Sequence, residues 1–330
     1  MINNYPLLDM VFTWVDGTDD KIIQKRNLYK HENDVVHNPP VRYEQINEII
    51  FSIKSVLKFI KWINKIYIVT DNQIPPIDKY LIESGKIIII DHNDIIPKKY
   101  LPTFNSDVIE SFLHNIKGLS EIFLYNNDDM MHFNYVKRSD VYKIKNNKIF
   151  FKIIDEGYNP LVEKYKFKLN SLFSKILKIK LKIMSEHSQR LYYTEKVIYN
   201  HYNETIDLIN NHHTKFLRKS TMKYIEDEFS EELHKMRKHR FRSTGYIQYL
   251  FLFMNVDNQL HKNIITKKSN NNNDVYVKSF DIFNLKKNDF TTVLHQRPKF
   301  ACLNSMNHSL KDKFEKCMNI FFVNSHDTKK

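Results

Sequence analysis

Glycine and cysteine are scarce in this chain of 330 residues, and each shortage excludes a kind of site. Only five glycines occur, and neither of the glycine-rich phosphate-binding patterns, GxxxxGK(S/T) and GxGxxG, is present. A bound nucleotide would therefore depend on side chains, a metal ion and helix ends. The two cysteines, Cys302 and Cys317, are too few for a disulfide framework or a zinc site, so we expect a reducing compartment, the cytoplasm.

Long apolar runs are also missing. A membrane-spanning helix needs about 18 consecutive apolar residues, and no such stretch occurs, so we expect no transmembrane helix. The first 17 residues, MINNYPLLDMVFTWVDG, have no charged segment followed by a long apolar core, so we expect no signal peptide. The apolar fraction is nevertheless 42%, with 23 Phe and 19 Tyr, which is enough for a large core.

The net charge of +13 favours a polyanion or an anionic membrane as a partner, although the abundance of Lys, Asn and Ile also fits an AT-rich genome. The segment 164–183, KYKFKLNSLFSKILKIKLKI, interleaves basic and apolar residues. It is either an amphipathic helix at the inner face of the cytoplasmic membrane or a solvated basic helix packed on the protein. The first alternative predicts a cytoplasmic protein with peripheral membrane contact.

The pattern of apolar residues predicts an α/β fold. Short apolar runs predict strands over 7–15, 65–70, 87–91 and 122–125. Spacing of three and four predicts helices over 42–62 and 106–115, the second with Ser106 as its N-cap. This β-α-β-β-α-β order favours a Rossmann-like or glycosyltransferase-A-like, mainly parallel sheet flanked by helices.

The second half of the chain has a weaker pattern. We expect a basic helical insertion around 137–210, a helical region over 214–255, a loop over 270–274 and a late strand over 299–304. No repeat or clean linker is evident, so the sequence predicts one catalytic domain over 1–330.

Polar clusters follow three of the predicted strands. They are Trp14-Val15-Asp16, Thr70-Asp71-Asn72 and Asn127-Asp128-Asp129. Because the carboxyl ends of parallel strands meet at one edge of a sheet, these clusters are expected to share a ligand crevice. Adjacent carboxylates there suit Mg²⁺ or Mn²⁺ held against a phosphate. The alternative is an Asn-Asp turn that caps the strand or opens a helix.

Four blocks of the sequence form a pattern in a fixed order. The first is DMVFTWVDG, residues 9–17, and the second runs from Arg42 through KIYIVTDNQIP and LPTFNSDVIE to NNDDM. The third begins near His212 and includes FSEEL and RFRS, residues 240–243, and the fourth is RPKFACLN, residues 297–304. In these blocks the sequence resembles the Stealth family of sugar-1-phosphate transferases, and the resemblance covers most of the chain.

The resemblance implies a phosphotransferase that acts on a nucleotide-sugar donor, typically a UDP-N-acetylhexosamine. Sugar-1-phosphate would move to a hydroxyl of a growing capsular or exopolysaccharide chain, UMP would leave, and the anomeric configuration would be kept. A Mg²⁺ or Mn²⁺ ion would neutralise the diphosphate.

The resemblance also implies roles for individual residues. Asp128, Asp129 and Asn304 would hold the metal ion. The catalytic residues would be His212 as general base, Arg242, which would bind phosphate oxygens, and Asp129. The positions matched to donor contacts are Asp9, Trp14, Asp16, Arg42, Asp71 and Asn105.

Each assignment has a structural alternative. The neighbour His213 could take the place of His212, and Arg242 could belong to a solvated basic helix face with Arg237 and Arg240. Trp14 could be a core residue, and Asp16 could only form a turn before Gly17. Arg42 and Asn105 could be framework groups.

The fourth block departs from the family pattern Cys-Leu-Asn-Asp, because Ser305 stands in place of the aspartate. Loss of one carboxylate predicts a raised metal requirement or poor activity. Thr214 also replaces a common proline. Ser305 keeps a second function open, that of a degenerate, non-catalytic relative that binds glycan or membrane. The net positive charge alone keeps a third open, that of a basic nucleic-acid-binding protein. The sequence has no nucleic-acid recognition motif, so we expect no nucleic-acid partner.

Overall fold

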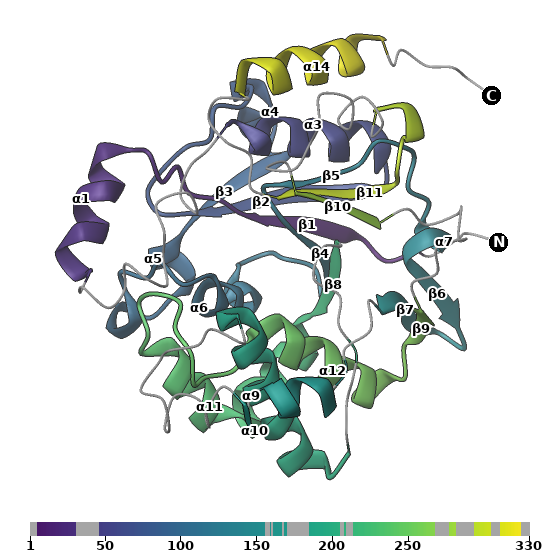
Figure 1. The fold of residues 1–330 in the computed structure, drawn as a ribbon. Coiled ribbons are helices and arrows are strands. Elements are labelled where there is room, and N and C mark those ends of the chain that lie inside the picture. The colour runs from purple at the N-terminus through teal and green to yellow at the C-terminus, as the bar shows by residue number, and fades with distance from the viewer. Residues whose placement is uncertain are drawn as a thin grey trace.

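A five-stranded sheet forms the centre of the fold (Figure 1). The structure is a computed structural model, and it describes residues 5–30, 46–155, 159, 161–166, 168–169, 185–204, 208, 214–267, 277–281, 294–304 and 311–324. The sheet order is β3-β2-β1-β4-β8, with bounds β1 Leu8–Thr13, β2 Ile63–Thr70, β3 Ile87–Asp91, β4 Ile122–Asn127 and β8 Lys215–Arg218. The first four strands are parallel and β8 is antiparallel to β4, which confirms the predicted α/β fold with a mainly parallel sheet.

Helices cover both faces of this sheet (Figure 1). On one face lie α3 (Glu48–Phe59) and α14 (Lys311–Asn324). On the other lie α6 (Ser106–Glu110), α9 (Glu186–Tyr202), α10 (Lys219–Glu228), α11 (Ser230–Arg237) and α12 (Tyr249–His261). Shorter elements are α1 (Asp20–Tyr29), α4 (Lys79–Glu83), α5 (His92–Ile95), α7 (Arg138–Val141) and the 3₁₀ turns η2 (Lys98–Tyr100) and η3 (Leu113–Asn115). Coverage on both sides explains why β1 is an almost continuous apolar run.

The helix predicted over 42–62 is present in its central part as α3. Its apolar positions at spacings of three and four, Ile49, Ile53 and Val56, are fully or almost fully buried against the sheet. Residues 42–45 lie outside the described part of the chain, and after Phe59 the chain turns into β2.

Two small sheets flank the central one. The first has the order β10-β11-β5, with β5 at Met130–Met131, β10 at Val277–Asp281 and β11 at Phe300–Asn304. The second has the order β6-β7-β9, with β6 at Tyr142–Lys145, β7 at Lys148–Asp155 and β9 at Ile264–Lys267. Strand β11 confirms the late strand predicted over 299–304. Its pairing with β5 brings the fourth sequence block beside the Asp128-Asp129 pair.

The sequence analysis expected a helical insertion around 137–210, and this expectation was partly wrong, because the region also contains strands. Residues 142–155 form the β6-β7 hairpin, whose two-residue loop is Asn146-Asn147 with φ of 50° and 57°. Positive φ at both positions is the type I′ geometry that joins antiparallel strands, and asparagine tolerates it. Of the basic segment 164–183, only 164–166 and 168–169 are described, and they are helical, so its membrane role stays a prediction.

Two further expectations need correction. The region 214–255 begins with strand β8, not with a helix, because its first residues pair with β4. The N-cap of α6 is Asn105, whose side chain accepts a hydrogen bond from the Asp107 N–H, and Ser106 is the first helical residue. The loop predicted over 270–274 lies outside the described residues. Within the described part of the chain, no helix has the length and apolar character needed to cross a membrane.

Candidate active site

A cavity of about 220 Å³ opens at the carboxyl ends of the parallel strands. The described residues that line it come from the ends of β1, β2 and β4, from helices α1, α5 and α6 and from two loops. They are Thr13, Trp14, Val15, Ile22, Asp71, His92, Thr103, Phe104, Ser106, Ile109, Asn127, Asp128 and Arg242. Strand β1 lies between β2 and β4, so the order of the strands in the sheet reverses direction at β1. The cavity therefore lies at the switch point of the sheet, where α/β proteins bind ligands. Four predicted site residues, Trp14, Asp71, Asp128 and Arg242, line this one space.

A buried polar network lies beneath the cavity. The hydroxyl of Tyr125 is within hydrogen-bonding distance of three oxygens: Thr13 Oγ1 at 2.9 Å, Glu110 Oε1 at 3.0 Å and Asn127 Oδ1 at 2.8 Å. Thr13 and Asn127 line the cavity, whereas Glu110 and Tyr125 are buried. The network ties the ends of β1 and β4 to α6.

Glu110 is a strongly perturbed member of this network. Burial raises the pKa of its carboxyl to about 8, the charge of Asp107 adds to the rise, and the cations Arg242 and Lys215 oppose it. At neutral pH the carboxyl is therefore mostly protonated. Its second oxygen, Oε2, has no hydrogen-bond partner among the described residues.

Arg242 is positioned by contacts between two loops. The Phe104 N–H donates to the Arg240 carbonyl at 2.7 Å, and the rings of Phe104 and Phe241 stack with centroids 5.0 Å apart. These contacts align the loop before α6 with the loop after α11. The Arg242 guanidinium then donates to Ser106 Oγ at 2.6 Å at the cavity wall. The geometry favours a role at the site over a purely solvated basic face.

The opposite wall carries Asp71 and His92. Both carboxylate oxygens of Asp71 accept from Lys25 Nζ, at 2.7 and 2.8 Å, so α1 is fastened to the end of β2. His92 is the first residue of α5 and is only 2% exposed. Burial lowers the pKa of its imidazole, while Asp71 and Asp91 oppose that effect.

The carboxylate pair lies at the end of β4. Asp128 lines the cavity, and Asp129 is connected to β11, because its carbonyl accepts from the Leu303 N–H at 2.9 Å and its Oδ2 from Cys302 Sγ at 3.3 Å. Burial raises the pKa of the nearby Glu48 to about 8, and the charges of Asp128 and Asp129 contribute to the rise. This crowding of negative charge is the kind of place where a bound cation is stabilising.

The donor set fits Mg²⁺ or Mn²⁺ in chemistry but is small. Magnesium is usually held by one or two carboxylates, with water and substrate phosphate supplying the other oxygens. Within the described residues, no group of three or more His, Cys, Asp and Glu side chains has the arrangement of a metal site. The backbone of Asn304 ends β11, and its side chain and all of Ser305 lie outside the described part of the chain.

The structure contradicts the assignment of Asp9 to the donor site. Asp9 is the second residue of β1 and lies roughly 13 Å along the strand from its carboxyl end. Its carboxylate accepts hydrogen bonds from the Ser120 N–H and hydroxyl, from Asn64 and from the Lys65 N–H. Asp9 therefore joins three segments at the amino-terminal edge of the sheet.

Asn105 is also a framework residue, not a donor contact. It is fully buried, its side-chain oxygen caps α6, and its NH₂ group donates to the His239 carbonyl and to the Tyr246 hydroxyl. All of its amide groups are thus used within the protein. The sequence analysis had left this alternative open, and the burial of the loop decides it.

Asp16 forms a turn next to the cavity but is not among its described lining residues. Its Oδ1 accepts from the Thr18 N–H at 2.9 Å and from the Thr18 hydroxyl at 2.6 Å. Its backbone N–H and carbonyl are both bound by the Gln73 side chain. The contact of Asp16 with a donor stays a prediction. The assignments to His212, with its neighbour His213, and to Arg42 fall outside the described residues.

The sequence analysis missed several residues of the site. Those that the structure adds are Lys25, Glu48, His92, Ser106, Glu110 and Tyr125. Glu48, Ser106 and Glu110 lie on helices, so only the packing of α3 and α6 on the sheet brings them to the carboxyl edge. His92 could have been predicted as a site residue from the sequence, because it directly follows a predicted strand.

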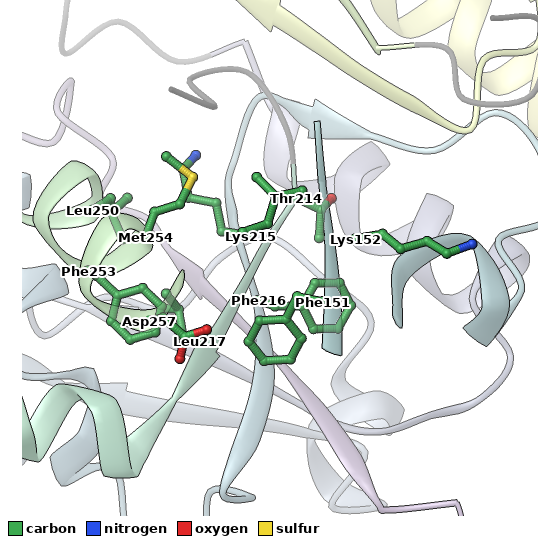
Figure 2. A pocket seen from close by; sticks show the side chains of 11 residues that line it. Phe151, Lys152, Thr214, Lys215, Phe216, Leu217, Leu250, Phe253, Met254 and Asp257 are labelled. Atoms are coloured by element: carbon green, nitrogen blue, oxygen red, sulfur yellow. The ribbon is translucent and has the colours of Figure 1, made fainter. Parts of the chain in front are cut away.

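A second cavity lies between β7, β8 and α12 and is much smaller, about 30 Å³ (Figure 2). Phe151 and Phe216 form part of its wall, with ring centroids 4.9 Å apart. Its acid, Asp257, already accepts hydrogen bonds from Arg218 and Thr221. The space is about that of one water molecule, so it does not compete with the larger cavity as a donor site.

Comparison with known proteins agrees with the second and third sequence blocks. Residues 42–150 match Stealth protein CR2, conserved region 2, and residues 211–255 match Stealth protein CR3, conserved region 3. The capsular polysaccharide phosphotransferase fcs1 of Haemophilus influenzae is 32% identical over 97% of this chain and 85% of its own. The chain belongs to the Stealth family. LcbA of Neisseria meningitidis, also named a capsular polysaccharide phosphotransferase, is 48% identical over 37% of this chain and 34% of its own.

Similarity to solved structures is weaker. Mouse xyloside xylosyltransferase 1 aligns with 91% of this Stealth chain and 98% of its own at 10% identity and a TM-score of 0.41. The galactosyltransferase LgtC, solved with donor and acceptor sugar analogues, aligns with 98% of both chains at 9% identity and a TM-score of 0.40.

Proposed function

We propose that this Stealth phosphotransferase moves a sugar-1-phosphate, such as N-acetylhexosamine-1-phosphate, from a UDP-sugar to a hydroxyl of a growing capsular or exopolysaccharide chain. Relatives named capsular and exopolysaccharide phosphotransferases support the substrate class. The observation that carries the proposal is that Asp128 and Arg242 line the same cavity at the switch point of the sheet. A carboxylate for a metal ion and a cationic group for phosphate oxygens recur at sites of phosphoryl transfer.

The reaction follows from these groups. The acceptor oxygen attacks the sugar-bearing phosphorus, and the bond from that phosphorus to the bridging oxygen breaks. UMP leaves with the electron pair, and the acceptor proton passes to a general base, for which His212 is proposed. Arg242, held by Ser106, would bind the non-bridging oxygens as negative charge develops. A Mg²⁺ or Mn²⁺ ion held by Asp128 and Asp129 would supply further charge neutralisation.

The test is the identity of the released nucleotide. Purified protein is incubated with a panel of UDP-sugars, an oligosaccharide acceptor and Mg²⁺ or Mn²⁺, and UMP and UDP are separated. We expect acceptor-dependent UMP release, reduced by about 10²-fold or more in His212→Ala. His213→Ala is the matched control and should retain activity within a few-fold. Release of UDP instead would show glycosyl transfer and overturn the proposal.

Ser305 motivates the second candidate, a degenerate relative without turnover. If the chain is active, Ser305→Asp should lower the Mg²⁺ or Mn²⁺ concentration that gives half-maximal UMP release, because it restores the carboxylate that the family pattern has at this position. An unchanged metal dependence would place Ser305 away from the ion. Binding of UDP-sugar without any UMP or UDP release would instead favour the degenerate relative.

A further inference from the structure

His92 is a buried polar side chain that the proposed chemistry leaves without a role. It lines the large cavity directly after β3 and is 2% exposed. Neither Nδ1 nor Nε2 has a hydrogen-bond partner among the described residues. Buried polar groups are almost always hydrogen-bonded, because an unsatisfied one lowers stability. A histidine kept in this state at a cavity wall is explained by a ligand that supplies the missing partner.

The surroundings of His92 favour a neutral imidazole. The charged groups that act on it are Asp71, Asp91 and Lys25, and burial outweighs the two carboxylates and lowers its pKa. Asp91 is already engaged by the N–H groups of Asn93 and Asn72, at 2.8 and 2.5 Å. A neutral ring has one N–H donor and one nitrogen acceptor, which suits an uncharged polar ligand better than a phosphate.

The two walls of the cavity differ in chemistry and lie far apart. Asp128 and Arg242 mark one wall, where β4 ends, and His92 marks the other, where β3 ends. Strands β2 and β1 lie between them, so three interstrand spacings separate β3 from β4. At about 4.8 Å each, these spacings place the walls roughly 14 Å apart. A ligand that spans both would have its charged group at β4 and an uncharged polar group at β3.

Other residues that line the cavity between the ends of β2 and β1 have the features of a site for a flat, partly apolar group. Trp14 and Ile22 contribute an aromatic and an aliphatic surface, and Asp71 contributes carboxylate oxygens held by Lys25. Aromatic faces stack on nucleobases, and carboxylates accept hydrogen bonds from ribose hydroxyls. These groups match a nucleoside more closely than a second sugar phosphate.

We propose that His92 hydrogen-bonds the uridine of the donor, which lies against Trp14 and Ile22 beside Asp71 while the diphosphate points toward Asp128 and Arg242. The inference rests on the proposed UDP-sugar donor. It assigns His92 as a binding residue for the nucleoside, and it fixes the direction in which the donor lies across the sheet.

The test separates the two walls by using ligand fragments. Uridine and UMP binding is measured in EDTA by quenching of Trp14 fluorescence. Trp14→Phe is the control for the signal. The other tryptophan, Trp62, donates to the Val136 carbonyl and is not among the described lining residues of the cavity, so its fluorescence should not respond. Binding of Mg²⁺-pyrophosphate is measured by calorimetry. Three variants are compared: His92→Phe, His92→Gln and His114→Phe. His114 is a matched control, a largely buried histidine with an unpartnered Nδ1 that does not line the cavity.

We expect His92→Phe to raise the Kd for uridine and UMP about tenfold, since one hydrogen bond to the ligand is lost. Its Kd for Mg²⁺-pyrophosphate should stay within twofold, and its Tm without ligand should stay equal or rise, because an unsatisfied polar ring is replaced by an apolar one. His92→Gln should recover part of the uridine affinity, and it also serves if the phenylalanine variant does not fold. His114→Phe should bind uridine as the unsubstituted protein does.

Two outcomes would overturn the inference, and they are distinguishable. If the unsubstituted protein binds uridine and both His92 variants bind it equally well, His92 is not a nucleoside contact, while the proposed donor class stands. If the unsubstituted protein binds neither uridine nor UMP but does bind Mg²⁺-pyrophosphate, the UDP-sugar donor itself is wrong.

Discussion

Both ends of the strands in the central sheet carry a buried acid, but the two acids differ in how many of their oxygens are hydrogen-bonded. At the amino-terminal edge, Asp9 accepts hydrogen bonds from Ser120, Asn64 and Lys65. At the carboxyl edge, Glu110 keeps one oxygen without a partner among the described residues, and both nitrogens of His92 are in the same state. A saturated network stabilises a fold, whereas unsatisfied groups beside a cavity lower stability and are retained for a ligand.

The largest expected effect is at the carboxyl edge. Asp128→Asn should reduce UMP release about 10³-fold, roughly 4 kcal/mol of transition-state stabilisation, because it removes a charged metal ligand. The Tm should stay equal or rise, since the substitution removes one of the two carboxylate charges that raise the pKa of Glu48. The rate and the Tm are measured on the same preparation.

Asp78→Asn is the control for this change in charge. Asp78 is exposed and caps α4 by accepting from the Tyr80 N–H, a role that asparagine fills equally well. It should leave both activity and Tm near those of the unsubstituted protein. Full activity in Asp128→Asn would show that this carboxylate does not hold the metal ion.

The opposite response is expected at the amino-terminal edge. Asp9→Ala should lower the free energy of unfolding by about 3 kcal/mol, because it leaves the partly buried donors of Ser120, Asn64 and Lys65 without their acceptor. Urea unfolding measures this loss. The fraction that stays folded should turn over at a rate within about threefold of normal, as the cavity lies at the far end of β1. A large loss of kcat at unchanged stability would contradict this purely structural role and support the predicted role of Asp9 at the donor site.

These two acids also show what the sequence could and could not reveal. The parallel order of the strands was readable from apolar runs, and it brought Trp14, Asp71 and Asp128 to one edge because parallel strands share a direction. Asp9 already stood near the start of the strand predicted over 7–15, so its assignment to the site came from the resemblance and not from the strand order.

Residues on helices were beyond the sequence for another reason. Glu110 reaches the Tyr125 network only because α6 packs under the end of β4, and no periodicity predicts that contact. Likewise, the β6-β7 hairpin depends on the turn at Asn146-Asn147, a local signal that the basic composition of the region obscured.

Glu110 offers a smaller test, through pH. Its pKa is about 8 in the folded protein and near the ordinary value of 4.5 when unfolded, so the folded state binds more protons between these values. Stability from this group is therefore lost as pH rises from about 4.5 to 8. Glu110→Gln removes that titration and keeps an acceptor for Tyr125.

The free energy of unfolding of Glu110→Gln should therefore fall less between pH 5.5 and pH 8.5 than that of the unsubstituted protein, by about 3 kcal/mol. Some slope should persist in the variant, because Glu48 is shifted in the same direction. Urea unfolding at the two pH values measures both slopes. Identical slopes would mean that Glu110 is ionised in the folded protein at neutral pH.

The smallest effect is expected at Asp16. This residue lies at the carboxyl edge, but its Oδ1 accepts hydrogen bonds within the protein, as the carboxylate of Asp9 does at the amino-terminal edge. Asp16→Ala removes the contacts to Thr18, so we expect a loss of about 0.5 kcal/mol in stability. The loops after β1 and β2 should stay joined, because Gln73 binds the backbone of residue 16 and not its side chain. The KM for the donor should then change less than threefold. A tenfold rise in KM with normal stability would instead make Asp16 a donor contact, and it would show that a satisfied acid at this edge can still serve the ligand.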